Sequence, residues 1–246
     1  MKNCTKLFGT IALMAIIGFS FTACGGGDDD GGGGGGDGSL GATLTITNAQ
    51  VYNLTDEGKV GTPYNGTIEN LNHTRDFTID KVPIKPLGDL ISGSPSVTLI
   101  SGKLSISLGT PKSTALMDGD DFAGEGVTIS TSGAKYFALD WGFYDGTGDS
   151  ASNWVFQMME NSKNHYGAVY YIYVDKNIKI TGTFVDVDEE DDDGEYTTKT
   201  VYKMDLKTGW NSVIVEETAT GKDSSTFTMK TAKPTANHKW VITDME

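Results

Sequence analysis

The sequence predicts an all-β protein of mainly antiparallel strands, with a β-sandwich as the favoured architecture and a β-barrel as the alternative. Apolar residues recur at every second position in many short segments, and turns that contain glycine separate these segments. Long helical patterns are scarce. Many short strands joined by glycine turns are typical of a sandwich or a barrel.

Two segments in the first half of the chain predict strands. Apolar residues alternate with threonine in residues 44–54, and with serine or threonine in residues 97–108. Ser101 and Gly102 interrupt the second alternation, which is typical of a hairpin with a glycine turn. Aromatic-rich core strands are expected next, beginning at residues 134–144.

The second half continues with an aromatic-rich strand at residues 153–159 and an apolar strand at residues 167–174. Gly182, inside the following strand, predicts a β-bulge. The clearest strand covers residues 196–206, because its alternation is nearly strict and predicts one buried face. That face carries Tyr196, Thr198, Thr200, Tyr202, Met204 and Leu206.

The charge balance restricts the partners of the protein. The 246 residues include 33 acidic and 19 basic side chains, which gives a formal net charge of −14. Nucleic acids and anionic membrane surfaces are repelled by such a chain, so we expect no nucleic-acid partner.

Residues 1–23 predict a secretory signal peptide. Lys2 and Lys6 provide a positive start, and residues 7–21 are uncharged and mostly apolar. This apolar run is shorter than the roughly 20 residues that a membrane-spanning helix needs. Cleavage is therefore expected before Cys24.

The residues at the cleavage point, Phe21, Thr22, Ala23 and Cys24, resemble the lipobox of bacterial lipoproteins. Phe21 departs from the usual leucine. The resemblance implies diacylglycerol on the Cys24 thiol and acylation of its amino group. It also implies a lipid anchor in the cell envelope, at the outer membrane, and leaves the surface and periplasmic faces as alternatives.

Residues 24–39 predict a flexible linker after the lipidated cysteine. They are almost entirely glycine and aspartate, which have no apolar surface to bury. The acidic run resembles signals that send lipoproteins to the outer face of the outer membrane. The β-rich domain covers residues 40–246, with a candidate subdomain seam at residues 145–153.

The sequence shows no motif for catalysis, cofactor binding or metal binding. His73, His165 and His238 are far apart and lack the spacing of metal ligands. The acidic residues 186–195 have the ligand type that calcium prefers, but they do not fit the EF-hand spacing. We therefore expect a solvated hairpin loop there, and neither a metal nor a cofactor.

Tryptophans give the candidate ligand surface. In a domain without disulfides they are expected first as core residues. A surface tryptophan beside acidic or amide side chains suits carbohydrate. A sugar ring stacks on the indole, and its hydroxyl groups donate hydrogen bonds to the carboxylate or amide oxygens. On this pattern the candidate surface consists of Trp141, Asp145, Asp149 and Trp154.

The sequence thus predicts a lipid-anchored protein of the cell envelope that acts as a binding or structural module for a carbohydrate or protein ligand. Its segments SGKLSISLGTP and MDLKTGWN resemble segments of uncharacterised lipid-anchored bacterial surface proteins, which implies no activity. The alternative is an extracytoplasmic enzyme that acts on glycans through paired carboxylates. Whether the protein is an enzyme is left open at this point.

Overall fold

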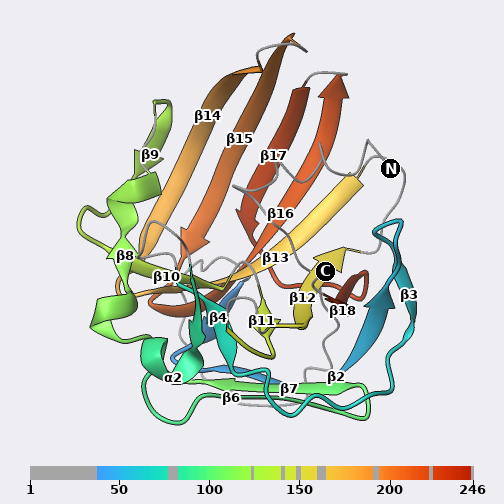
Figure 1. Cartoon of the computed structure of the whole chain (residues 1–246). Coiled ribbons are helices and arrows are strands. Elements are labelled where there is room, and N and C mark those ends of the chain that lie inside the picture. Colours follow the sequence, from blue (N-terminus) through green and yellow to red (C-terminus); the bar gives the residue numbers. More distant parts are fainter. Residues whose placement is uncertain are drawn as a thin grey trace.

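The structure, a computed structural model, describes residues 38–76, 83–122, 125–139, 142–147, 151–159, 165–190, 194–221 and 224–244 (Figure 1). The predicted signal peptide, Cys24 and the linker up to residue 37 lie outside the described residues. The predicted all-β class is confirmed, because the described residues form an 18-stranded mixed sheet with a sandwich-like fold.

The elements follow one another with short connections. The strands of the first half are β1 (Ser39–Gly41), β2 (Leu44–Leu54), β3 (Val60–Pro63), β4 (His73–Arg75), β5 (Ile84–Pro86), β6 (Ser96–Ile100), β7 (Lys103–Leu108), β8 (Met117–Asp118), β9 (Val127–Ile129), β10 (Lys135–Leu139) and β11 (Phe143–Tyr144). The later strands are β12 (Asn153–Met159), β13 (His165–Val174), β14 (Ile178–Glu190), β15 (Gly194–Leu206), β16 (Gly209–Gly221), β17 (Ser224–Thr231) and β18 (His238–Asp244). The short helices are α2 (Leu87–Leu90), η2 (Ser113–Ala115) and η3 (Gly119–Phe122).

One continuous path of paired strands crosses the molecule. Its order is β9, β14, β15, β17, β16, β13, β12, β18, β2, β7 and β6. The pairs β15–β17 and β18–β2 are parallel, which the alternation of residues could not predict, and the others along this path are antiparallel. In the described part of the chain the end strands β9 and β6 do not pair with each other, so the sheet is not closed into a barrel.

Strands β14, β15, β17 and β16 are paired side by side and form a fan whose base is the turn from β15 to β16 (Figure 1). Only Lys207 and Thr208 separate β15 from β16, yet β17 pairs with both strands and lies between them. Asn177 Oδ1 accepts hydrogen bonds from the backbone and the hydroxyl of Thr208, at 2.8 and 3.1 Å. The buried Asn211 side chain binds the backbone N–H and C=O of Lys207, at 2.9 and 2.7 Å. These two asparagines hold the base together.

The sheet buries apolar residues on both faces near the base of the fan. Along β13, Val169 and Tyr171 belong to the main core, whereas Tyr170 and Ile172 belong to a second core. This alternation is what a strand covered on both faces requires. The main core includes Val51, Leu99, Leu104, Trp210 and Trp240, and the second core includes Ala168, Ile180, Met204, Leu206 and Val215.

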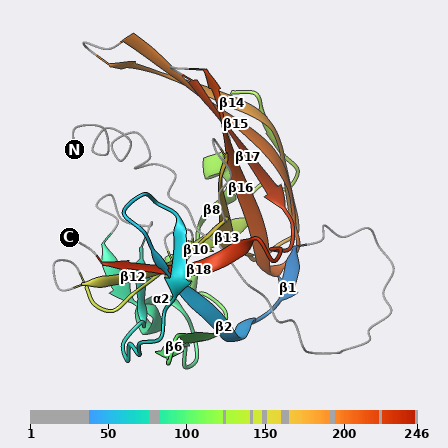
Figure 2. The ribbon, with the colours of Figure 1, turned by 90° about the vertical axis from the view of Figure 1, so that its right-hand side faces the viewer.

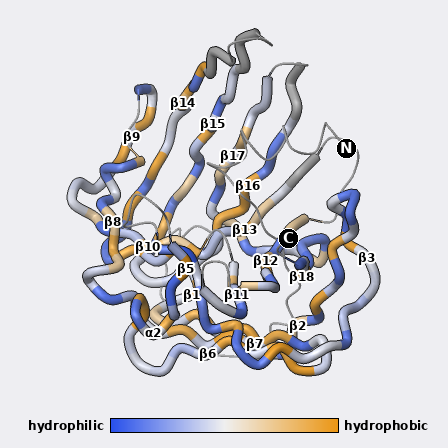
Figure 3. Tube along the Cα trace, viewed as in Figure 1, coloured by the Kyte–Doolittle hydropathy of each residue, from blue (hydrophilic) through white to orange (hydrophobic). Residues whose placement is uncertain are grey.

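The upper part of the fan is covered less completely. Seen from the side in Figure 2, strands β14 to β17 form a curved wing, and β2, β6, β12 and β18 gather below it. Figure 3 shows hydrophobic segments along β2, β6 and β7.

The strand that the sequence predicted most clearly is β15, and it has the expected faces. Met204 and Leu206 are fully buried, and Lys203 on the other face is exposed.

The predicted hairpin at residues 97–108 is confirmed as β6 and β7. Ser101 and Gly102 form its turn with φ angles of 49° and 73°, as the favoured two-residue hairpin turn requires.

The prediction of a bulge at Gly182 is wrong, because β14 keeps continuous register with β15 through this residue. Glycine is needed there for another reason: a Cβ atom would lie 2.1 Å from the carbonyl oxygen of Gly126.

Candidate functional site

The structure brings two of the four predicted site residues together. β11 ends at Tyr144, immediately before Asp145, and Trp154 on β12 pairs directly with Tyr144. Trp141 and Asp149 lie outside the described residues. The candidate ligand surface is therefore built here from Asp145, Trp154 and their neighbours.

The Asp145 side chain closes the connection between β11 and β12. Its Oδ1 accepts hydrogen bonds from the backbone N–H groups of Ser152 and Asn153, at 2.9 and 3.0 Å. Its Oδ2 accepts from the Ser152 hydroxyl at 3.0 Å and from the Asn153 amide at 2.6 Å. Burial, the largest influence, raises the pKa of Asp145, but the four hydrogen bonds together outweigh it and lower the pKa below its usual value. Both carboxylate oxygens are thus used to fix the loop.

Trp154 is the centre of a row of aromatic rings. It stacks on Phe156 with ring centroids 4.0 Å apart, and it lies parallel to the ring of Tyr144 at 6.0 Å. Strand alternation puts Trp154 and Phe156 on one face of β12, and the pairing of β11 with β12 adds Tyr144. Tyr144 and Phe156 are buried, and Trp154 is half-buried. We call Tyr144, Trp154 and Phe156 the aromatic row.

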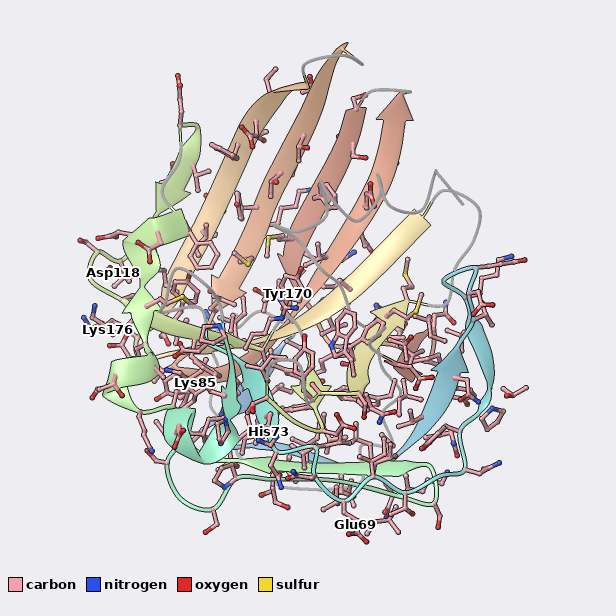
Figure 4. All side chains as sticks on the ribbon, viewed as in Figure 1. Glu69, His73, Lys85, Asp118, Tyr170 and Lys176 are labelled. Carbon is pink, nitrogen blue, oxygen red and sulfur yellow. The ribbon has the colours of Figure 1, made fainter. Side chains whose placement is uncertain are left out.

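Arg75 brings a positive charge to the aromatic row. Its Nε donates a hydrogen bond to the Tyr144 hydroxyl at 3.1 Å, and its guanidinium carbon lies 5.9 Å from the centroid of that ring. The pairing of His73 with Tyr144 sets the position of β4, and the Asp76–Lys85 ion pair, at 2.8 Å, links the residue after β4 to β5. Figure 4 shows His73 and Lys85 on these neighbouring strands. The register of the sheet thus fixes Arg75.

A second pairing of a cation with an aromatic ring lies on the same face of the sheet. Tyr52 belongs to the same apolar cluster as the β12 members of the aromatic row, and Lys239 Nζ lies 5.8 Å from its ring centroid. β12 meets β13 through the pair Met158 and Ala168, so this face continues toward Tyr170 near the centre of Figure 4. The aromatic row therefore lies on an extended face that carries both aromatic rings and cations.

Sequence reasoning missed most of this site. Phe156 and Tyr144 could have been found, because Phe156 alternates with Trp154 and Tyr144 directly precedes Asp145. Arg75 could not have been found by this reasoning, because it is 69 residues away from Tyr144 in sequence.

The other groups that were considered for chemistry lie apart from this site. His238 is buried on β18, where Thr235 donates a backbone hydrogen bond to its Nδ1 at 3.0 Å. Residues 186–190 and 194–195 belong to β14 and β15 next to their connection, and residues 191–193 lie outside the described residues. Within the described ranges, no group of three or more His, Cys, Asp and Glu residues is placed to hold a metal ion.

Comparisons with protein-family models, with curated proteins and with solved structures found no match to this chain. Across the residues that the structure describes, no helix is both long enough and apolar enough to cross a membrane.

Proposed function

We propose that this protein is a carbohydrate-binding module of the bacterial cell envelope, anchored by lipid on Cys24, and that Trp154, the partly exposed member of the aromatic row, belongs to its ligand surface. The observation that carries the proposal is the half-buried Trp154, whose ring stacks on Phe156 of the same strand and lies parallel to Tyr144 on β11. A sugar presents a flat apolar face that packs on an aromatic ring, and a ring that is already fixed loses little entropy on binding.

The contacts around Trp154 support binding rather than catalysis at this surface. Phe156 packs on the Trp154 ring, and Arg75 holds the Tyr144 hydroxyl. Asp145, the acidic residue next to the row, uses both carboxylate oxygens in the loop. A glycosidase needs one carboxylate to protonate the leaving group and a second to act as base or nucleophile. Asp145 is not available for either role, because its oxygens already accept hydrogen bonds in the loop.

The test uses the full chain with Cys24→Ser, which removes the lipidated thiol, on an array of bacterial and host glycans. We expect binding of one glycan class and at least a tenfold loss of affinity in Trp154→Ala, with partial recovery in Trp154→Phe. Tyr64→Phe, a partly buried aromatic residue outside the row, is the matched control. A glycan signal that Trp154→Ala leaves intact contradicts the proposed surface, and an array without any signal contradicts the proposed ligand class.

The anchor is tested separately from the ligand. Mass spectrometry of the wild-type protein from bacterial membranes should find an N-terminal Cys24 that carries acyl chains. Stable anchoring takes more than one acyl chain, and Cys24→Ser removes the thiol that carries the lipid, so this variant should be either an uncleaved or a soluble exported protein. An unmodified chain that starts at Met1 contradicts the lipid anchor and leaves the glycan experiment unaffected.

A further inference from the structure

The outer edge of β14 is paired along only part of its length. Its partner β9 covers Ile180, Thr181 and Gly182, and Thr183 donates one more hydrogen bond to Gly126 at 3.0 Å. Gly126 has a φ angle of 83°, which only glycine adopts easily. Among the described residues, no strand pairs with this edge of β14 beyond Thr183.

The alternation of the strand determines which backbone groups face outward. The N–H of Thr183 and the C=O of Lys179 both bond to the β9 side, at 3.0 and 2.9 Å. Alternate residues of a strand direct their backbone groups to the same side. The N–H and C=O groups of Val185 and Val187 therefore point away from β15, toward the uncovered edge. An exposed row of such groups is a template for another strand.

The side chains beside this edge are apolar on one face and acidic on the other. Val185 is 52% exposed and Val187 is 46% exposed, and with Ile100 they are the exposed large hydrophobic residues of the described chain. Asp186 lies between them on the opposite face and is exposed. The three residues that continue β14, at positions 188–190, are all acidic.

We propose that the outer edge of β14 at Val185–Val187 binds an extended peptide segment of a partner protein in which apolar and basic residues alternate. The main-chain groups of Val185 and Val187 pair with the added strand, as in other complexes where a peptide extends a sheet. The apolar residues of that strand pack on the two valines. Its lysine or arginine residues face Asp186, where an opposite charge directly across two strands is favourable.

Charge decides between this partner and a second copy of the same chain. Two antiparallel β14 edges paired through Val185–Val187 would place the Asp186 side chains of both copies opposite each other, and like charges across two strands are unfavourable. The overall net charge of −14 adds to that repulsion. A basic strand meets attraction at the same places.

The experiment uses the full chain with Cys24→Ser and a fluorescent nine-residue peptide of alternating valine and lysine. We expect saturable binding by anisotropy, and at least a tenfold weaker affinity for a peptide of equal composition with the valines and lysines in separate blocks. Asp186→Lys and Val187→Pro should each weaken binding at least tenfold. Proline at position 187 removes an outward N–H and leaves the pairing with β15 intact.

Ile100→Thr, at the exposed hydrophobic residue of β6, is the control variant and should bind normally. Circular dichroism and thermal melting check that each variant is folded. If Val187→Pro fails that check, Val187→Lys replaces it, and it should also weaken binding because it places a positive charge beside the basic strand. Equal binding of both peptides shows only general electrostatic attraction and overturns the proposal. The absence of binding to the alternating peptide also overturns the proposal, and this includes the case in which the protein dimerises through β14 instead.

Discussion

The outer edges of β6 and β14 lie toward opposite ends of the long sheet, where β6 is the last strand and β14 is partly covered by the short strand β9, and they differ in how they are protected. The outer edge of β6 is covered by the segment before β4: Ile68 donates a backbone hydrogen bond to Leu99 at 2.9 Å, and the Asn72 side chain accepts one from Val97 at 3.0 Å. Beyond Thr183, β14 has no such cover among the described residues. Acidic residues follow in the sequence there instead, and charged side chains are a recognised protection of strand edges against unwanted pairing.

The difference teaches that covering an edge and charging an edge have different consequences. A covered edge contributes buried area and hydrogen bonds to the free energy of unfolding. A charged edge keeps its backbone groups available and prevents only unsuitable partners from pairing. The β6 end should therefore be important for stability, and the β14 end should be important for recognition.

The largest expected effect is at the covered end. Leu99 on β6 is fully buried in the main core, so Leu99→Ala should lower the free energy of unfolding by about 3 kcal/mol, through lost burial and the cavity that remains. Urea denaturation of the parent and the variant measures the difference. A loss below about 1 kcal/mol, the range of an ordinary substitution, means that β6 is not firmly packed against its covering segment.

A smaller loss is expected when only the cover is changed. Asn72→Ala removes the side-chain acceptor of the Val97 N–H and should cost about 1 kcal/mol, the usual contribution of one hydrogen bond. Hydrogen exchange followed by NMR should show faster exchange of the Val97 amide, with the Leu104 amide as the internal reference. An unchanged Val97 exchange rate would show that this hydrogen bond does not protect the edge.

The middle of the sheet, away from both ends, should control the response to moderate acid. Burial, the largest influence, lowers the pKa of His238 below 6.5, so the folded state favours the neutral imidazole. The unfolded chain then binds more protons, and this contribution to stability is present above pH 6.5 and declines as the pH falls below that value. Denaturation between pH 7.5 and about pH 5.5 should show this decline. His238→Asn should flatten it, and equal slopes in both proteins would exclude His238 as the source.

The smallest effect is expected at the open end. Val187→Ala should change the free energy of unfolding by about 0.5 kcal/mol or less, because the side chain is 46% exposed. The same urea titration that is used for Leu99→Ala provides the comparison. A loss as large as that of Leu99→Ala would mean that β14 is covered at this position and that its edge is closed to a partner.

How much of this molecule the sequence could predict depends on how local each feature is. The β6–β7 hairpin was predictable because Ser101 and Gly102 lie between two alternating segments. The faces of β15 were predictable for the same reason. The position of β17 between β15 and β16 was not, because alternation shows which face of a strand is buried but not which strand lies beside it.

The candidate site follows the same rule. The sequence pointed to Trp154 and Asp145, which are near each other along the chain. It could not show that both carboxylate oxygens of Asp145 accept hydrogen bonds, from Ser152 and Asn153. Arg75 reaches Tyr144 only through the pairing of β4 with β11. Such pairings over long sequence distances leave no local signal.

The position of β18 between β12 and β2 affects the order in which the sheet can form. β18 joins β12 to β2, and among the described strands it comes latest in the sequence. A chain that emerges N-terminus first therefore exposes the facing edges of β12 and β2 until residues 238–244 arrive. Unpaired strand edges of this kind are prone to aggregate during folding. A chain that stalls before residue 238 leaves β2, β3, β6 and β7 without strand pairing to the rest of the sheet.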